Sequence, residues 1–298
     1  MKTALFVGLF LVAIPYLLAL GRAVVKGRAT FATGEDSPRP TLLGLVIGFV
    51  TNFFDTLGIG SFAPTTAIFK FTGLVRDERI PGTLNVGHTA PTLAEALIFI
   101  AIVSVDVWTL VLMIAAAVLG SWFGAGIVSG WPRRNIQIGM GCALLVAATL
   151  FLFKIFDIAP GEGDALALTG ARLAIGVGVS FLLGALMEMG VGLYGPCMIL
   201  VALLGMNPQA AFPIMMGSCA FLMPIGSLKF VRSGRYSLRA SLGFGLGGVP
   251  AVLIAAFIVK SIPLYYLRWL VVVVVLYAAL SMLRSAVVES RSPTPASA

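Results

Sequence analysis

Apolar runs about as long as a bilayer is thick recur along this chain from its first residues to about residue 284. A helix needs about 20 mainly apolar residues to cross the hydrocarbon core of a membrane. Only 11% of the 298 residues are charged, whereas soluble domains carry about 25%. The sequence therefore predicts an all-α polytopic membrane protein and excludes an ordinary soluble domain.

Two apolar segments, 41–72 and 168–204, are interrupted in the same way. The first contains GIGSFAP (Gly58 to Pro64) and the second contains GVGLYGP (Gly190 to Pro196). Glycine and proline are poor residues for the interior of a continuous helix. Each segment is too long for one span but long enough for two arms. We therefore predict that each forms a re-entrant broken-helix hairpin with its tip at the glycines.

The basic residues indicate the topology. Ordinary spans are expected near 3–21, 82–103, 107–130, 135–156, 209–228, 240–260 and 264–284. If each broken segment crossed the membrane once, five basic residues would face outward against the positive-inside rule: Lys70, Arg76, Arg79, Arg133 and Arg134. Hairpins place them inside, with the N-terminus out and the C-terminus in. The net charge of +8 is thus explained by loops, and no nucleic-acid partner is expected.

The chain also contains an internal duplication. An offset of 132 residues pairs Gly58 with Gly190, Gly60 with Gly192, Pro64 with Pro196, Gly73 with Gly205 and Pro81 with Pro213; later, Trp131-Pro132 matches Ile262-Pro263 after a small shift. Each copy would hold one hairpin and three spans, and an odd number of crossings inverts the second copy. Inverted repeats with interrupted segments are typical of secondary transporters.

These patterns divide the chain into five parts. They are an extra N-terminal transmembrane helix, retained in the protein, with a cytoplasmic loop (1–40), a first inverted repeat (41–156), an acidic extracytoplasmic linker (157–167), a second inverted repeat (168–284) and a disordered cytoplasmic tail (285–298).

The two hairpin tips are the candidate binding site. Irregular backbone at membrane depth is tolerated where it is buried or lines a cavity. Pro64 and Pro196 suit the first turn of a returning half-helix, whose free N–H groups attract anions. We therefore expect a small anion between the tips, bound by Gly58, Gly60, Ser61, Pro64, Thr65, Thr66, Gly190, Gly192, Tyr194, Gly195, Pro196 and Cys197. The alternative is that these glycines only allow close helix packing.

Ionisable residues within the apolar segments are candidates for proton coupling, because burying them is costly without a function. Asp55 and Glu188 each precede a tip, while His88 and Glu95 lie two turns apart on the next span, with Asn85 one turn before His88. A carboxylate near an anion site repels the substrate unless it is protonated. The alternative for Asp55 and Glu95 is a structural hydrogen bond or ion pair between helices.

Other function classes find little support. The cysteines Cys142, Cys197 and Cys219 and the single histidine have no metal-ligand spacing, so no metal and no cofactor are expected. An enzyme would need a nucleophile, a metal cluster or a paired acid and base at a water interface, and no such pattern is present. The expected partners are a small anion, protons and membrane lipids.

The pair GIGSFAP and GVGLYGP, each early in one half of a polytopic chain of about 300 residues, resembles the TauE/SafE sulfite exporter family, which includes permeases for organosulfur anions. The resemblance extends from Thr41 to Arg284. Ser61 and Leu193 stand where many members have a third glycine. The resemblance implies export or uptake of sulfite or a small organosulfonate across a bacterial-type cytoplasmic membrane, and of the two we expect export coupled to protons. Transport of another small anion or cation, and an uncoupled anion channel, remain alternatives.

Overall fold

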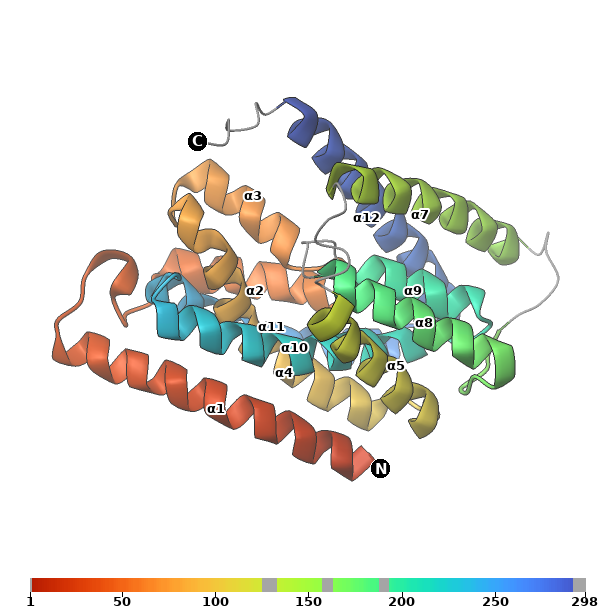
Figure 1. Cartoon of the computed structure of the whole chain (residues 1–298), viewed down its shortest axis with the longest axis horizontal. Helices are drawn as coiled ribbons and strands as arrows, with labels where there is room; N and C mark the ends of the chain where they lie inside the picture. Colours follow the sequence, from red (N-terminus) through yellow and green to blue (C-terminus); the bar gives the residue numbers. More distant parts are fainter. Residues whose placement is uncertain (1, 125–132, 157–162, 188–192, 292–298) are drawn as a thin grey trace. The chain divides into compact units, whose positions relative to one another are not determined.

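The computed structural model describes residues 2–124, 133–156, 163–187 and 193–291, and in these ranges the protein is built from helices without a strand (Figure 1). Six helices are long and apolar enough to cross a membrane: Lys2–Ala29, Asp77–Ile102, Gly170–Met187, Pro208–Ser233, Leu238–Ser261 and Trp269–Val288. The prediction of an all-α polytopic membrane protein is confirmed.

The helices form two compact units, each built from segments distant in sequence. Unit 1 comprises residues 1–107 and 212–262, and unit 2 comprises residues 108–211 and 263–298. Each unit therefore contains helices from both predicted repeats. The repeats are defined by sequence similarity, whereas the units are defined by which helices pack together. The repeats therefore stay a prediction.

Unit 1 contains six helices and two short 3₁₀ turns. They are α1 (Lys2–Ala29), η1 (Gly34–Asp36), α2 (Leu42–Thr56), α3 (Phe62–Thr72), η2 (Asp77–Arg79), α4 (Ile80–Ile102), α10 (Ala211–Ser233) and α11 (Leu238–Ser261). Hydroxyl caps mark two helix starts, because Thr41 accepts from the N–H of Gly44 and Ser237 accepts from that of Ala240. Small residues then let α2 and α11 approach each other closely, as in many membrane bundles.

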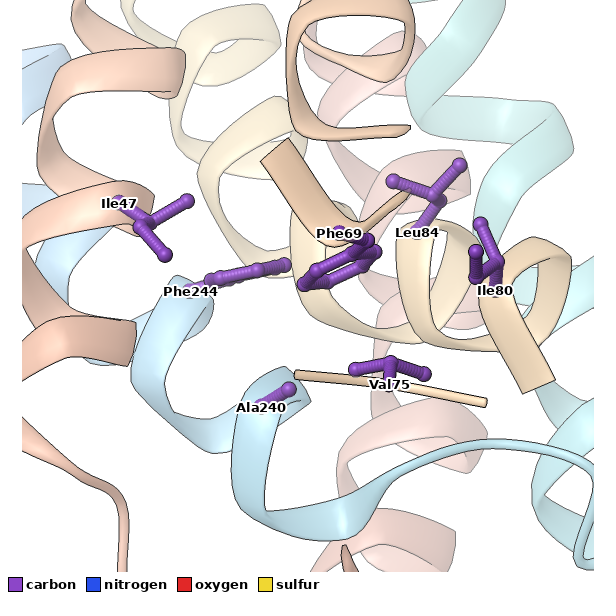
Figure 2. Close-up of a cluster of buried hydrophobic side chains, with 7 residues drawn as sticks. All are labelled: Ile47, Phe69, Val75, Ile80, Leu84, Ala240 and Phe244. Carbon is purple, nitrogen blue, oxygen red and sulfur yellow. The ribbon is translucent and has the colours of Figure 1, made fainter. Parts of the chain in front are cut away.

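A hydrophobic cluster connects α3 with α2, α4 and α11 (Figure 2). The rings of Phe69 and Phe244 stack with their centroids 5.4 Å apart, and Figure 2 shows them side by side between Ile47 and Leu84. The buried members of the cluster are Ile47, Phe69, Val75, Ile80, Leu84, Ala240 and Phe244. The half-helix α3 is therefore fixed to the rest of unit 1 through its last turns.

Ion pairs hold together the two ends of the α2–α3 segment. Arg76, after α3, contacts Glu35, before α2, at 3.1 Å, and Arg79 contacts Asp36 at 2.7 Å. Arg79 also donates to the carbonyl oxygen of Tyr236 at 3.4 Å. The chain thus leaves and returns at the same end of unit 1, as a hairpin requires.

Unit 2 contains the remaining helices. They are α5 (Val107–Leu119), which continues as the π-helical turn η3 (Gly120–Gly124), then α7 (Arg133–Ile155), α8 (Gly170–Met187), α9 (Tyr194–Leu203), η4 (Pro208–Ala210) and α12 (Leu264–Arg291). The expected span 107–130 is described only as far as Gly124, and its last residues lie outside the described ranges.

Backbone hydrogen bonds join the two ends of the α8–α9 segment. The Ala165 N–H donates to the Gly205 carbonyl at 3.3 Å, and the Asn207 N–H donates to the Ala165 carbonyl at 2.9 Å. This segment therefore also leaves and returns at one end of its unit. Its first arm, α8, has 18 residues and is long enough by itself to cross a membrane, which was not expected of a hairpin arm.

The two halves of the sequence share a local order of structure. Each has a half-helix ending near a glycine with positive φ (Gly73, 62°; Gly205, 85°), then a 3₁₀ turn and a long helix with proline in its first turn. One packing contact is repeated as well. A Cβ on Gly248 would meet Asn52 in unit 1, and one on Gly184 would meet Ala117 in unit 2. Asn52 aligns with Gly184, and Ala117 aligns with Gly248 when the Trp131–Ile262 match sets the offset. These correspondences support the duplication, while the inversion of the copies stays a prediction.

Candidate functional site

The tip of the first hairpin is a short turn that requires glycine. The helix α2 ends at Thr56, and Gly58 and Gly60 follow with φ of 96° and 87°. Residues other than glycine rarely adopt such positive φ angles. Pro64 occupies the first turn of α3, where its missing N–H costs nothing. The turn therefore has the form expected from the glycines and the proline.

A carboxylate of the protein lies at the N-terminus of α3. Ser61 precedes this helix, and its hydroxyl donates to Asp55 Oδ2 at 3.1 Å. Both side chains are buried. The N-terminus of a helix carries a partial positive charge that favours an anion. Asp55 therefore occupies the kind of position in which the sequence led us to expect a bound anion.

His88 connects the two arms of the first hairpin. Its Nδ1 lies 2.9 Å from Asn52 Oδ1 on α2, and its Nε2 lies 3.2 Å from Thr65 Oγ1 on α3. Because Asn52 Nδ2 donates to the Gly48 carbonyl at 2.6 Å, its oxygen faces the histidine, so His88 donates from Nδ1. Neutral His88 then accepts from the Thr65 hydroxyl at Nε2.

The imidazole of His88 is wholly buried and lies near two aromatic rings. Its centroid lies 5.2 Å from that of Phe244 and 5.8 Å from that of Phe62. This packing and the two hydrogen bonds restrict the ring, so its two nitrogens point in fixed directions. His88 is therefore suited to hold α2 and α3 in one relative position.

Glu95 reaches the last turn of α2 from α4. Its Oε1 lies 2.7 Å from the Thr56 hydroxyl, and its side chain is wholly buried. The structure thus brings Asp55, His88 and Glu95 to the last two turns of α2 and the tip that follows. Sequence reasoning selected these three residues but missed Asn52 and Thr56. The sequence pattern that could have identified them is the polar series Asn52, Asp55 and Thr56, at helical spacing immediately before the glycines.

Asn85 belongs to a different contact. Its side-chain oxygen accepts from the Ser227 hydroxyl on α10 at 3.3 Å, and Ser227 also contacts the Thr89 hydroxyl at 2.8 Å. It therefore connects α4 with α10 instead of joining His88. Thr66 donates to the Phe62 carbonyl within its own helix at 2.8 Å.

The second tip is described only in part. Glu188, Gly190 and Gly192 lie outside the described residues. Tyr194, Gly195, Pro196 and Cys197 open α9 and are all buried. Pro196 is the third residue of α9, as Pro64 is the third residue of α3. A Cβ on Gly195 would lie 2.7 Å from the Ala278 Cβ, so this glycine also allows close packing of α12.

Within the described ranges, no group of three or more His, Cys, Asp or Glu side chains could hold a metal ion. The first tip itself presents buried ionisable side chains, hydroxyl donors and a helix N-terminus.

A family model described as Sulfite exporter TauE/SafE matches residues 2–151. No curated protein and no solved structure matches the chain. The matched residues include the whole first hairpin and α4. They therefore include every residue described above as a hydrogen-bond partner of Asp55, His88 or Glu95. Phe244, which packs against the His88 ring, lies outside the match.

Proposed function

Because this chain belongs to the sulfite exporter TauE/SafE family, an integral membrane family that transports sulfur anions, we propose that it is a secondary transporter exporting sulfite or a small organosulfonate in exchange with protons or together with them. The family match over half of the chain carries this proposal. The first hairpin supplies its physical basis, since it unites an anion-attracting helix end with buried proton-binding groups.

Asp55 provides a way to couple the two ions. As a carboxylate it accepts from Ser61 at the N-terminus of α3. A substrate anion arriving at the same donors would be repelled by that carboxylate until a proton neutralises it. Proton binding to Asp55 would therefore accompany anion binding at Ser61 and the first turn of α3. In this scheme the proton and the anion move in the same direction.

For sulfite, the membrane potential favours export under such coupling, whereas a sulfonate monoanion with one proton carries no net charge and gains nothing from it. A sulfite dianion accompanied by one proton still carries one net negative charge, and moving one charge through 100 mV is worth about 2.3 kcal/mol. A membrane potential that is negative inside therefore favours its exit. We propose the orientation that the basic residues predict, with the N-terminus outside and the ion-paired end of unit 1, at Arg76 and Arg79, facing the cytoplasm.

The test is flux of sulfite, and of a small sulfonate, into proteoliposomes with and without an imposed pH gradient. We expect saturable flux that moves the anion from the acidic to the alkaline side. The Asp55→Asn and Ser61→Ala variants should lose pH dependence and affinity respectively, because one removes the proton site and the other a donor. Thr72→Ala is the matched control on the same half-helix, since its hydroxyl donates to the Ile68 carbonyl within α3 and lies outside the predicted anion-binding set.

Three outcomes would contradict parts of this proposal. If no sulfur oxyanion moves, the substrate assignment is wrong. Flux that rises linearly with concentration and ignores pH would identify an uncoupled channel. If Asp55→Asn keeps full pH-driven accumulation, the role of Asp55 is wrong. The contribution of the second tip, including Glu188, stays a prediction that the same assay tests with Glu188→Gln.

A further inference from the structure

The Thr56 hydroxyl lies close to two oxygen atoms. It is 2.8 Å from the Asn52 carbonyl oxygen and 2.7 Å from Glu95 Oε1. Both distances are typical of O–H···O hydrogen bonds. A hydroxyl has one hydrogen to donate, although it can accept further bonds. If the two contacts are separate hydrogen bonds, they need two hydrogens, of which Thr56 supplies only one.

The second hydrogen has one source. The Asn52 carbonyl oxygen carries no hydrogen, so its bond uses the hydrogen of Thr56. This is the familiar bond from a helical threonine to the carbonyl four residues earlier. The contact between Thr56 and Glu95 then requires a hydrogen on Glu95, because a protonated carboxyl group is a donor as well as an acceptor.

We propose that Glu95 is a proton-binding site, occupied in this conformation, and that its carboxylic acid donates to Thr56 Oγ1. Asp55 differs from it. The Ser61 hydroxyl donates to Asp55 Oδ2, and this bond requires no proton on the carboxyl group. Of the two buried carboxyl groups at the end of α2, Glu95 thus acts as a donor and Asp55 as an acceptor. Such divided roles are characteristic of paired acidic groups that handle protons.

The described part of unit 1 contains few buried groups that could exchange a proton with Glu95. The buried titratable side chains of unit 1, within the described ranges, are Tyr16, Asp55, His88, Glu95, Cys219 and Tyr236. Tyr16, from α1, donates to the Val86 carbonyl at 2.7 Å, and Tyr236 lies in the loop before α11. Cys219 is on α10, and the buried residues of α3 and α11 include no acidic or basic side chain. Asp55 on α2 and His88 on α4 are the buried groups at the same end of the hairpin.

Loss of the proton from Glu95 has a structural consequence. A carboxylate cannot donate, so Thr56 must turn its own hydrogen toward Glu95 and release the Asn52 carbonyl. The last turn of α2 then loses a bond immediately beside Asp55 and before the glycine tip. The proton on Glu95 is in this way linked to the tip by Thr56. This role in the cycle rests on the transport function proposed above, whereas the presence of the proton does not.

Infrared difference spectra between the wild-type protein and its variants test directly whether Glu95 holds a proton. The protein, purified in lipid at neutral pH, should show the C=O stretch of a protonated carboxylic acid. Glu95→Gln should remove this band, while Asp55→Asn should leave it. Thr56→Val should keep the band but shift its frequency, because the acid loses its acceptor. Gln can still donate to Thr56, so the fold should be preserved. An unchanged spectrum in Glu95→Gln would overturn the proposal, and an unshifted band in Thr56→Val would overturn the assigned partner.

Transport tests the role separately. Glu95→Gln should still exchange labelled for unlabelled sulfite across vesicles without a pH gradient, but should lose accumulation driven by that gradient. Unchanged accumulation would show that Glu95 is not part of the coupling. If the wild-type protein moves no sulfur oxyanion, the proposed function fails, while the infrared result still decides whether Glu95 holds a proton.

Discussion

Gly48 is the position at which one methyl group should do most damage to the first hairpin. A Cβ there would lie 2.5 Å from the Cα of Phe244 and 3.0 Å from the carbonyl oxygens of Gly243 and Phe244. Real Cβ atoms essentially never approach closer than 3.0 Å. All three neighbours are backbone atoms of α11, so no side chain can rotate away. Gly48→Ala must therefore push α2 and α11 apart by about half an ångström or more.

The magnitude follows from comparison with a second glycine of the same helix pair. Overpacking of this kind costs about 1–3 kcal/mol. Replacing a helical glycine by alanine also gains about 1 kcal/mol in helix propensity. Gly245→Ala on α11 has the same gain, but its Cβ would have no neighbour closer than 3.9 Å. The difference between the two variants thus isolates the packing cost, and we expect Gly48→Ala to be less stable by about 1–3 kcal/mol.

Unfolding of the purified protein in detergent measures this difference. Gly48→Ala should unfold at a lower temperature than the wild-type protein, and Gly245→Ala at the same or a higher temperature. Because α2 carries Asn52, Asp55 and Thr56, Gly48→Ala should also slow anion flux. Equal unfolding temperatures for the two variants would refute the close backbone contact between α2 and α11.

Three further predictions concern side chains. His88→Ala should lower the unfolding free energy by about 1–3 kcal/mol, because Asn52 and Thr65 lose a buried partner; His88→Asn should recover part of the loss, and equal stability of the two variants would contradict the Asn52 bond. Arg79→Ala should destabilise the protein more than Arg76→Ala, because Arg79 has a side chain 17% exposed and Arg76 one 58% exposed; the same order should appear in urea unfolding at low salt, and a reversed order would count against the ion pairs. Burial and the Asp36 carboxylate raise the pKa of Tyr236 to about 12 against the opposing charge of Arg79. The folded state therefore retains this proton at a pH where the unfolded chain has lost it, so wild-type stability relative to Tyr236→Phe should be constant below about pH 10 and fall between about 10 and 12. A flat difference across that range would contradict the burial of the phenol.

The sequence was most informative where a pattern is local. The apolar runs predicted the helices, and Gly58, Gly60 and Pro64 predicted the break between α2 and α3. The spacing of His88 and Glu95 placed them on one face of a helix, and both do reach α2. The same reasoning grouped Asn85 with His88. A step of three residues rotates a helix by about 60° away from alignment, and this was enough for Asn85 to meet α10 instead.

Contacts between distant segments could not be predicted in this way. That α11 is the helix lying against Gly48 depends on the complementary shapes of two small-residue surfaces, which no local periodicity encodes. Asn52 and Thr56 were missed for a related reason. Their importance comes from the atoms they face on α4, and those partners become visible only when the helices are packed.

The dependence of α2 on α11 also affects how the protein is made. A ribosome completes α2 well before it begins α11, because α3 to α10 are synthesised between them. At about 5–20 residues per second, the interval is roughly 10–40 s. During that time the small-residue surface of α2 must face lipid, the translocon or a temporary partner helix. A chain stopped before α10 would never acquire its permanent neighbour, so the N-terminal half should be degraded when expressed alone and rescued when the C-terminal half is supplied as a separate polypeptide.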